Sequence, residues 1–157
     1  MQLVTHRGML FCGMATSFER DRYSGGSSYI YCKASADAPW KLEADFGPGT
    51  SRVGQMFSAR FMHDEHGRPI ASGPQDVLVA FTMSLARGMR EPGPLQMRVR
   101  DDATGQWETV ALPTPKVAGS NVRELWQHRD SVTGADLIFV AANPSPLGIY
   151  AGVYDPA

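Results

Sequence analysis

Three short stretches of the chain share one pattern of apolar and polar positions. Each copy reads polar, large apolar, large apolar, polar, small or His, and then Arg. The copies are residues 2–7, 55–60 and 124–129. Adjacent apolar residues without the spacing of an amphipathic helix suit a strand that is buried on both faces. An apolar run follows each copy, at 9–15, 77–83 and 137–143. The pattern therefore predicts a repeated unit that opens with two strands.

Further strands are predicted after each of these pairs. A third apolar-rich stretch follows in every copy, and a fourth, opened by Trp40 or Trp107, follows in the first two. The segments before these tryptophans, 35–39 and 101–106, are rich in Asp, Ala and Gly, as hairpin turns are. We expect successive strands of each unit to pair antiparallel. The expected strands are residues 2–6, 9–15, 28–34, 40–46, 53–58, 77–83, 95–100, 107–112, 122–127, 137–142 and 148–153.

One stretch fits a helix as well as a strand. Residues 74–91 carry apolar side chains at near-helical spacing, with Asp76 placed as an N-cap. The repeat favours a strand, because the equivalent stretches of the other two copies are strongly β-like and too short for helices. A helix across 77–88 would contradict the alignment.

The predicted units define the fold class and the domain organisation. Four-stranded antiparallel units of this size, repeated radially, form the blades of a β-propeller. We therefore expect an all-β protein in which the whole chain, 1–157, is a single propeller segment and an incomplete ring. The expected blades cover about 1–50, about 51–119 and, as a partial third blade, about 120–157.

The turns before the two tryptophans carry a family-like motif. They read "SADAPW" (35–40) and "DDATGQW" (101–107). Together with the strand pattern they make nearly the whole chain resemble a β-propeller of the kelch or Asp-box (BNR-like) type, whose box reads roughly Ser-x-Asp-x-Gly-x-x-Trp. The first turn lacks the glycine, the second has it one position late, and the kelch glycine pair occurs once, at Gly25-Gly26. In that family the box ties a turn to its blade, so the resemblance implies a structural role and no catalysis.

Charge and hydropathy argue against two classes of partner. The 157 residues include 15 Lys and Arg against 16 Asp and Glu, without the basic excess that binds a nucleic-acid backbone. No apolar run approaches the ~18 residues that span a membrane. The first residues do not resemble a signal peptide, because polar positions interrupt them, and we expect a cytoplasmic protein. Cys12 and Cys32 suit free buried thiols, although a hairpin between them leaves a disulfide open.

Repeated arginines supply the candidate ligand site. Arg7, Arg60 and Arg129 end the three copies, and His6 and His128 precede two of them. The first strand of a propeller blade lines the central channel. These side chains would therefore ring one mouth of that channel and bind an anion or a carboxylate. The alternative is structural, with the same residues capping loops or pairing with Asp and Glu between blades.

The remaining candidates favour structural roles. The stretch "HDEHG" (63–67) offers closely spaced metal ligands, but no second cluster completes a site. We expect a polar surface loop there, with no metal and no cofactor. Trp40 and Trp107 are expected to pack between blades rather than to stack on a sugar. Trp126 and Phe57 share a first-strand position, and we expect both in the core.

These features predict a binding module that recognises a small polar ligand, such as a glycan, or a protein partner. Nucleophile, phosphate-loop and dinucleotide motifs are missing, which argues against an enzyme. The alternative is a hydrolase or lyase at the channel mouth, which requires Arg7, Arg60 and Arg129 to converge with a carboxylate and a tyrosine. A second alternative is a structural or assembly protein. Because residues 147–154 would be an open apolar edge, we expect either a piece of a longer propeller or a homo-oligomer.

Overall fold

The computed structural model describes residues 1–14, 27–47, 50–86, 91–112, 121–143 and 148–155. Regular structure in these residues is entirely β, and they contain no helix that is long and apolar enough to cross a membrane. The strands are β1 (Gln2–His6), β2 (Met9–Met14), β3 (Tyr29–Lys33), β4 (Lys41–Asp45), β5 (Thr50–Phe61), β6 (Gln75–Ala86), β7 (Glu91–Arg100), β8 (Trp107–Ala111), β9 (Asn121–Arg129), β10 (Asp136–Asn143) and β11 (Gly148–Val153).

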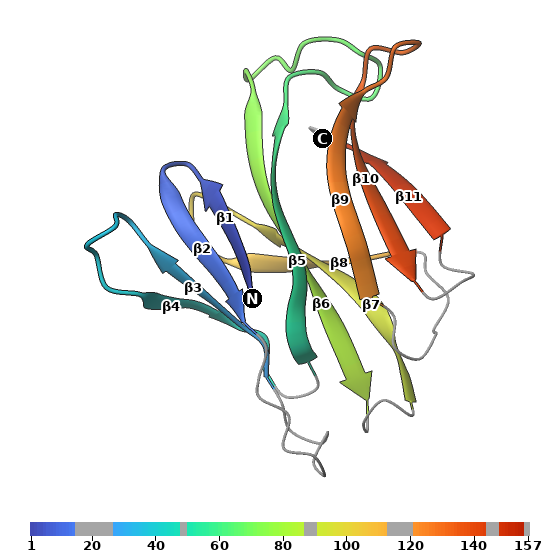
Figure 1. Cartoon of the computed structure of the whole chain (residues 1–157). Coiled ribbons are helices and arrows are strands. Elements are labelled where there is room, and N and C mark those ends of the chain that lie inside the picture. Colours follow the sequence, from blue (N-terminus) through green and yellow to red (C-terminus); the bar gives the residue numbers. More distant parts are fainter. Residues whose placement is uncertain (15–26, 48–49, 87–90, 113–120, 144–147, 156–157) are drawn as a thin grey trace.

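The strands form three antiparallel sheets (Figure 1). The strand orders are β1-β2-β3-β4 in the first sheet, β5-β6-β7-β8 in the second and β11-β10-β9 in the third. In each sheet every strand pairs with the next one along the chain. The predicted strands and their antiparallel pairing are thereby confirmed. The stretch that also fitted a helix is the strand β6.

The hydrogen-bonding registers of the three sheets correspond. First and second strands pair through Leu3 and Cys12, Met56 and Ala80, and Leu125 and Val140. The same second-strand residues pair on their other side with Tyr31, Arg98 and Tyr150. Residues that the sequence pattern aligns therefore occupy equivalent positions in the three ladders.

β6 lies between two hydrophobic cores. Val79 and Phe81 pack in the core shared with the third sheet, whereas Leu78 and Ala80 pack in the core shared with the first. All four side chains are buried. A strand with two buried faces carries a continuous apolar run rather than a strict alternation, which explains its near-helical spacing.

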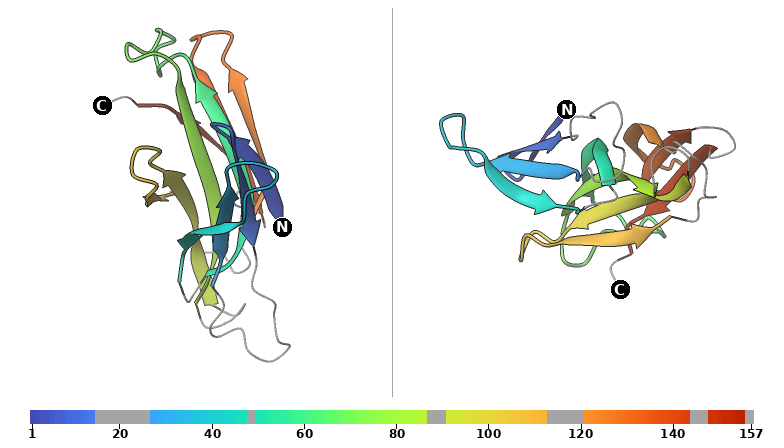
Figure 2. Two further views of the ribbon diagram at one scale, coloured as in Figure 1. Left: turned by 90° about the vertical axis from the view of Figure 1, so that its left-hand side faces the viewer. Right: turned by 90° about the horizontal axis from the view of Figure 1, so that it is seen from below.

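The three sheets stand side by side in chain order (Figure 2). β5 contacts both β1 and β9, so the first strands of the sheets are neighbours. The last strands, β4, β8 and β11, lie at the opposite edges of their sheets. The sheets fan out from the first strands and, within the described residues, do not close into a ring.

Polar side chains join the neighbouring first strands. Ser58 Oγ of β5 lies 2.8 Å from Nδ1 of His6 in β1. Gln127 of β9 bonds the backbone of Arg60 in β5 twice. Its Oε1 accepts from the Arg60 amide at 3.0 Å, and its Nε2 donates to the Arg60 carbonyl at 2.6 Å. These side chains link strands that belong to separate ladders.

The long loop between β5 and β6 is fastened to the third sheet. Gly67 has a φ of +72°, and a Cβ added to it would lie 2.0 Å from the carbonyl oxygen of Thr133 in the β9–β10 turn. Only glycine fits such an approach. The amides of Met62 and His63 both donate to Asp136 Oδ2, at 2.6 and 2.8 Å.

The two cysteines lie on adjacent strands of the first sheet. The ladder pairs Cys32 with Phe11 and Cys12 with Tyr31. Because successive residues of a strand point to opposite faces, the two sulfur atoms leave opposite faces of the sheet. Both cysteines are free and buried, as the sequence predicts.

Candidate functional site

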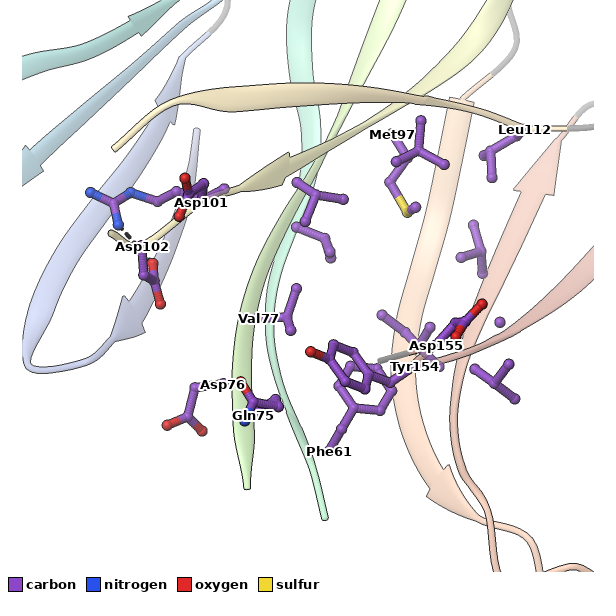
Figure 3. A pocket seen from close by; sticks show the side chains of 18 of the residues that line it. Phe61, Gln75, Asp76, Val77, Met97, Asp101, Asp102, Leu112, Tyr154 and Asp155 are labelled. Atoms are coloured by element: carbon purple, nitrogen blue, oxygen red, sulfur yellow. Dashed lines mark hydrogen bonds and ion pairs between the residues drawn. The ribbon is translucent and has the colours of Figure 1, made fainter. Parts of the chain in front are cut away.

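A cavity of about 670 Å³ lies between the second and third sheets (Figure 3). Its walls are mostly apolar. They come from β6, β7 and β8 on one side and from β10 and β11 on the other, and they include Val77, Val99, Leu112, Val140, Tyr150 and Tyr154. The volume falls within the range of about 300–1,000 Å³ that is usual for ligand pockets.

Acidic and aromatic groups accompany these apolar walls. Asp76, Asp101 and Asp155 contribute to the lining, and Figure 3 shows Tyr154 and Asp155 at one end of it. Tyr154 stacks on Phe61, with ring centroids 5.5 Å apart and planes inclined by 30°. Two arginines also line it, so the polar part of the lining carries charges of both signs. The cavity therefore suits a ligand with an apolar body and a hydrogen-bonding group.

β11 contributes an unbroken run of residues to the cavity. Its last four residues, Tyr150 to Val153, and the two residues that follow it line the cavity. From Tyr150 onward the strand alternates between half-buried and exposed positions, as expected of a strand with one covered face. β11 pairs with β10 on one side, and no described strand pairs with its other edge.

Asp102 lines the cavity and joins the first two sheets. Its carboxylate contacts His6 Nε2 at 2.8 Å, Arg7 Nε at 2.8 Å and Arg100 Nη1 at 2.7 Å. Burial raises the pKa of Asp102, but hydrogen bonds from His6 and Arg100 lower it more, so the pKa lies below its usual value. Asp102 is therefore an ionised carboxylate that is already neutralised by its neighbours.

The conformation of the hairpin between β1 and β2 brings Arg7 to this carboxylate. Arg7 and Gly8 form its two-residue turn, with φ values of 46° and 77°, as in a type I′ turn. A positive φ costs an ordinary residue about 1–2 kcal/mol. In this conformation the Arg7 guanidinium reaches Asp102 of the neighbouring sheet.

The same network continues to the fourth strand of the first sheet. Arg100 Nε lies 2.7 Å from Oε1 of Glu43, and the Cys32 thiol donates to Glu43 Oε2 at 3.3 Å. Burial raises the pKa of Cys32, and the hydrogen bond and charge of Glu43 raise it further, to about 11. The thiol is therefore protonated at neutral pH and is a poor nucleophile.

Ser58, His6 and Asp102 form a chain of hydrogen bonds that resembles a hydrolytic triad. The two links are 2.8 Å each. His6 is 3% exposed, and the Asp102 charge is already shared with Arg7 and Arg100. Neither Ser58 nor His6 lines the cavity. The chain of bonds thus favours a structural bridge between sheets over a nucleophile that meets substrate.

The three repeated arginines have separate partners. Arg7 contacts Asp102, whereas Arg60 lies 3.6 Å from Asp76. Arg129 donates to the Gly134 carbonyl of its own turn. Of these arginines, Arg7 lines the cavity. Because their partners lie in different places, the three arginines favour structural pairing, or positions at the rim of the cavity, over a single site at which all three bind one anion.

The two histidines next to the repeated arginines differ in their surroundings. His6 is buried, whereas His128 is exposed, with its ring 6.4 Å from that of Phe139. Arg129 also contacts His63 Nε2 at 3.1 Å. The ligand-binding role of these residues stays a prediction.

Neither a family model, nor a curated protein, nor a solved structure matches this chain. Within the described residues, no group of three or more His, Cys, Asp or Glu side chains is placed to hold a metal ion. The stretch 63–67 is a loop, as predicted, but its Asp64 is buried and accepts from the Arg68 guanidinium at 2.8 Å.

The tryptophans divide between core and surface. Trp107 packs against the core between the first two sheets, which confirms its expected place. Trp40 is 44% exposed and Trp126 is 37% exposed, so their predicted burial is wrong. Trp40 lies under Lys33, whose Nζ is 5.4 Å from the ring centroid. Trp126 stacks on Phe139 on the face of the third sheet, with ring centroids 5.4 Å apart.

The sequence pattern did not identify Asp102 as a residue of the site, because it was interpreted as an ordinary turn residue. Its neighbour Asp101 closes the turn by accepting hydrogen bonds from the Ala103 amide and the Thr104 hydroxyl. Asp102 instead contacts the first sheet. A signal for the turn was present. The motif Asp-x-x-Thr-Gly occurs at 101–105 and again at 130–134, and both copies carry a bond from the glycine amide to the first Asp carbonyl.

Proposed function

We propose that this chain is a binding module and that the cavity between its second and third sheets is the recognition site. The observation that carries the proposal is the cavity itself. It has a ligand-sized volume of about 670 Å³, apolar walls from two sheets and carboxylates in its lining. Such a combination is the usual form of a ligand site.

The lining favours an apolar or aromatic ligand group over a purely polar one. Val77, Val99 and Val140 offer no hydrogen bonds, whereas Asp76 and Asp155 accept them. A glycan would leave many hydroxyl groups facing aliphatic walls, at a cost for each unpaired polar group. A ligand with an apolar body and one donor group satisfies both kinds of surface.

The separation of the arginines supports binding over hydrolysis. A hydrolase at a channel mouth would require Arg7, Arg60 and Arg129 to converge on one substrate carboxylate. The contacts of Arg7 with Asp102 and of Arg129 with its own turn hold these guanidinium groups in separate places. A propeller segment that binds through its inter-sheet space is consistent with this arrangement.

Binding of the neutral apolar dye Nile red tests the cavity. We expect saturable dye fluorescence with the wild-type protein and a loss of affinity of about tenfold or more in Val110→Asp, because the substitution places a charge in an apolar wall. Val110 lines the cavity and is 38% exposed, so the variant should fold. Val132→Asp makes the same change in the β9–β10 turn and should bind like wild type. Equal binding by both variants would remove the cavity as the site.

A structural or assembly role is the second candidate. Large apolar side chains are exposed on the first sheet, at Leu3 and Leu42, and on the third, at Trp126, Ile149 and Val153. These two sheets end the array, and exposed apolar patches mark association surfaces. Light scattering of the wild type and of Leu42→Asp tests this role. A monomer at all concentrations would argue against it.

A further inference from the structure

The interface between the first two sheets contains an aromatic contact that suggests what fills the cavity. Phe46, which follows β4, packs edge-on against Trp107, the first residue of β8, with ring centroids 6.0 Å apart and planes at 88°. Arg98 lies over the Phe46 ring, with its Cζ 4.9 Å from the centroid. The indole thus enters the first interface from the fourth strand of the second sheet.

The registers identify the matching positions at the second interface. Arg98 and Tyr150 pair with equivalent second-strand residues. Tyr150 therefore has the position in the third sheet that Arg98 has in the second. Leu112 follows β8 as Phe46 follows β4, because Ala111 pairs with Gln96 as Asp45 pairs with Tyr29. Both Leu112 and Tyr150 line the cavity.

The tryptophan itself has no counterpart among the described residues of the third sheet. Trp107 pairs with Arg100, and Gly152 of β11 holds the place of Arg100 in the third ladder. The third sheet has three described strands where the others have four. The cavity at the second interface therefore corresponds to the space that the indole of a fourth strand fills at the first interface.

We propose that the edge of β11 accepts an extended polypeptide strand whose tryptophan, opposite Gly152, fills the cavity. The strand would run antiparallel to β11 and pair with its backbone, as in recognition by β-strand addition. The indole would pack against Leu112 and Tyr150. This inference rests on the proposed function, because it names the ligand class of the same cavity.

Specificity for a large aromatic group follows from the lining. The walls at Leu112 and Tyr150 are apolar, and Gly152 contributes no side chain that would compete for the space. Asp76 and Asp155 lie within the same cavity and can accept a hydrogen bond from the indole N–H or from a basic residue of the strand. Tryptophan combines a large apolar surface with one donor.

The chain's own fourth strand provides the probe. A fluorescently labelled, N-acetylated peptide with the sequence of residues 106–112 (QWETVAL) is titrated with the protein, and its anisotropy is followed. We expect saturable binding, with a loss of about tenfold or more when the peptide tryptophan is replaced by alanine. Leu112→Asp in the protein should weaken binding by a similar factor, and Val132→Asp should not.

Backbone pairing is tested with N-methylated peptides. An antiparallel strand uses alternate amides for pairing with its neighbour. One peptide methylated at the amides of Glu, Val and Leu is compared with one methylated at those of Thr and Ala. One set should abolish binding and the other should leave it intact. Equal effects of the two sets, or equal binding of the tryptophan and alanine peptides, would overturn the proposal.

The dye and peptide measurements separate the two levels of inference. Nile red binding that depends on Val110, without peptide binding, would leave the cavity as a ligand site and refute strand addition. If neither Nile red nor the peptide binds, the proposed function is refuted as well. Peptide competition against bound Nile red completes the scheme, because a strand whose indole fills the cavity must displace the dye.

Discussion

Nε2 of His6 lies 2.8 Å from Oδ2 of Asp102, although the two residues belong to different sheets. The contact places a turn of the second sheet over the first hairpin of the chain. Arg7 and Arg100 bind the same carboxylate. One aspartate therefore links the first hairpin of the first sheet to β7 of the second, and its removal has consequences in each sheet.

Asp102→Ala is expected to lower the free energy of unfolding by about 3 kcal/mol, because it removes the carboxylate that Arg100 and His6 share, and both of these side chains are largely buried. Asp37→Ala is the matched control, since Asp37 lies exposed in the corresponding turn of the first sheet and its loss should cost within about 0.5 kcal/mol. Urea unfolding of the two variants checks the difference. Similar midpoints would show that the network contributes little.

Stability should fall steeply in acid. Burial raises the pKa of Asp102 and of Asp136, but hydrogen bonds from His6 to the first and from the Met62 and His63 amides to the second lower both below their usual value. A lowered folded-state pKa stabilises the protein above the unfolded value of about 3.9 and loses this effect as pH falls through the folded value. The melting temperature should therefore fall as the pH is lowered below about 4.

The variant Asp136→Asn tests this assignment. It should melt lower than wild type at pH 7, because the neutral amide accepts the Met62 and His63 amide bonds more weakly. Its midpoint should then change less between pH 5 and pH 3. An acid slope equal to that of the wild type would exclude Asp136 as a source of the acid sensitivity.

Two arginines should differ sharply in their importance for stability. The Arg100 side chain is 12% exposed and binds both Glu43 and Asp102, whereas that of Arg60 is 63% exposed and lies 3.6 Å from Asp76. We expect Arg100→Ala to cost about 3 kcal/mol and Arg60→Ala to cost less than about 1 kcal/mol. Thermal unfolding distinguishes them. A large loss in Arg60→Ala would contradict its assignment as a surface pair.

Trp107 and Trp40 provide a matched pair for the interface between sheets. Trp107→Ala removes the partner of Phe46 from a packed interface and should cost about 3 kcal/mol. Trp40 directly precedes β4, the corresponding strand, but is exposed under Lys33, so Trp40→Ala should cost less than about 1 kcal/mol. Equal losses, measured by denaturant unfolding, would refute the claim that the first interface depends on this indole.

Amide hydrogen exchange should distinguish β11 from β10. Residues 137–142 of β10 pair with both β9 and β11, whereas β11 pairs with β10 alone among the described strands. Alternate amides of residues 148–153 should therefore exchange much faster than those of 137–142 in a monomer. Uniform protection across β11 would mean that something already covers its edge.

The strands were predictable because their causes are local. The apolar runs of β2, β6 and β10 and the turn residues between strands are visible in the sequence, and they also decided correctly against a helix in β6. The partners of the charged side chains were not predictable. Asp101 and Asp102 are adjacent and chemically identical, yet one closes its own turn and the other crosses to Arg7. That difference depends on how two sheets pack, which no short stretch of sequence records.

The position of Trp40 illustrates the same limit. The sequence pattern makes it equivalent to Trp107, and it directly precedes β4 whereas Trp107 begins β8. Burial of either indole, however, requires a preceding sheet to pack against, and within the described residues the first sheet has none on that side. An equivalent place in a strand therefore predicts the direction of a side chain better than it predicts its burial.

The close approach of Gly67 to Thr133 also fixes one corner between the second and third sheets. This corner has no space for even one additional carbon atom, and the atoms that meet there belong to the backbone of the β5–β6 loop and of the β9–β10 turn. A side chain can make room by changing its rotamer, but two backbone segments in contact cannot. The spacing of the two sheets at this corner is therefore set by the main chain itself, and it does not depend on which side chains pack between the sheets.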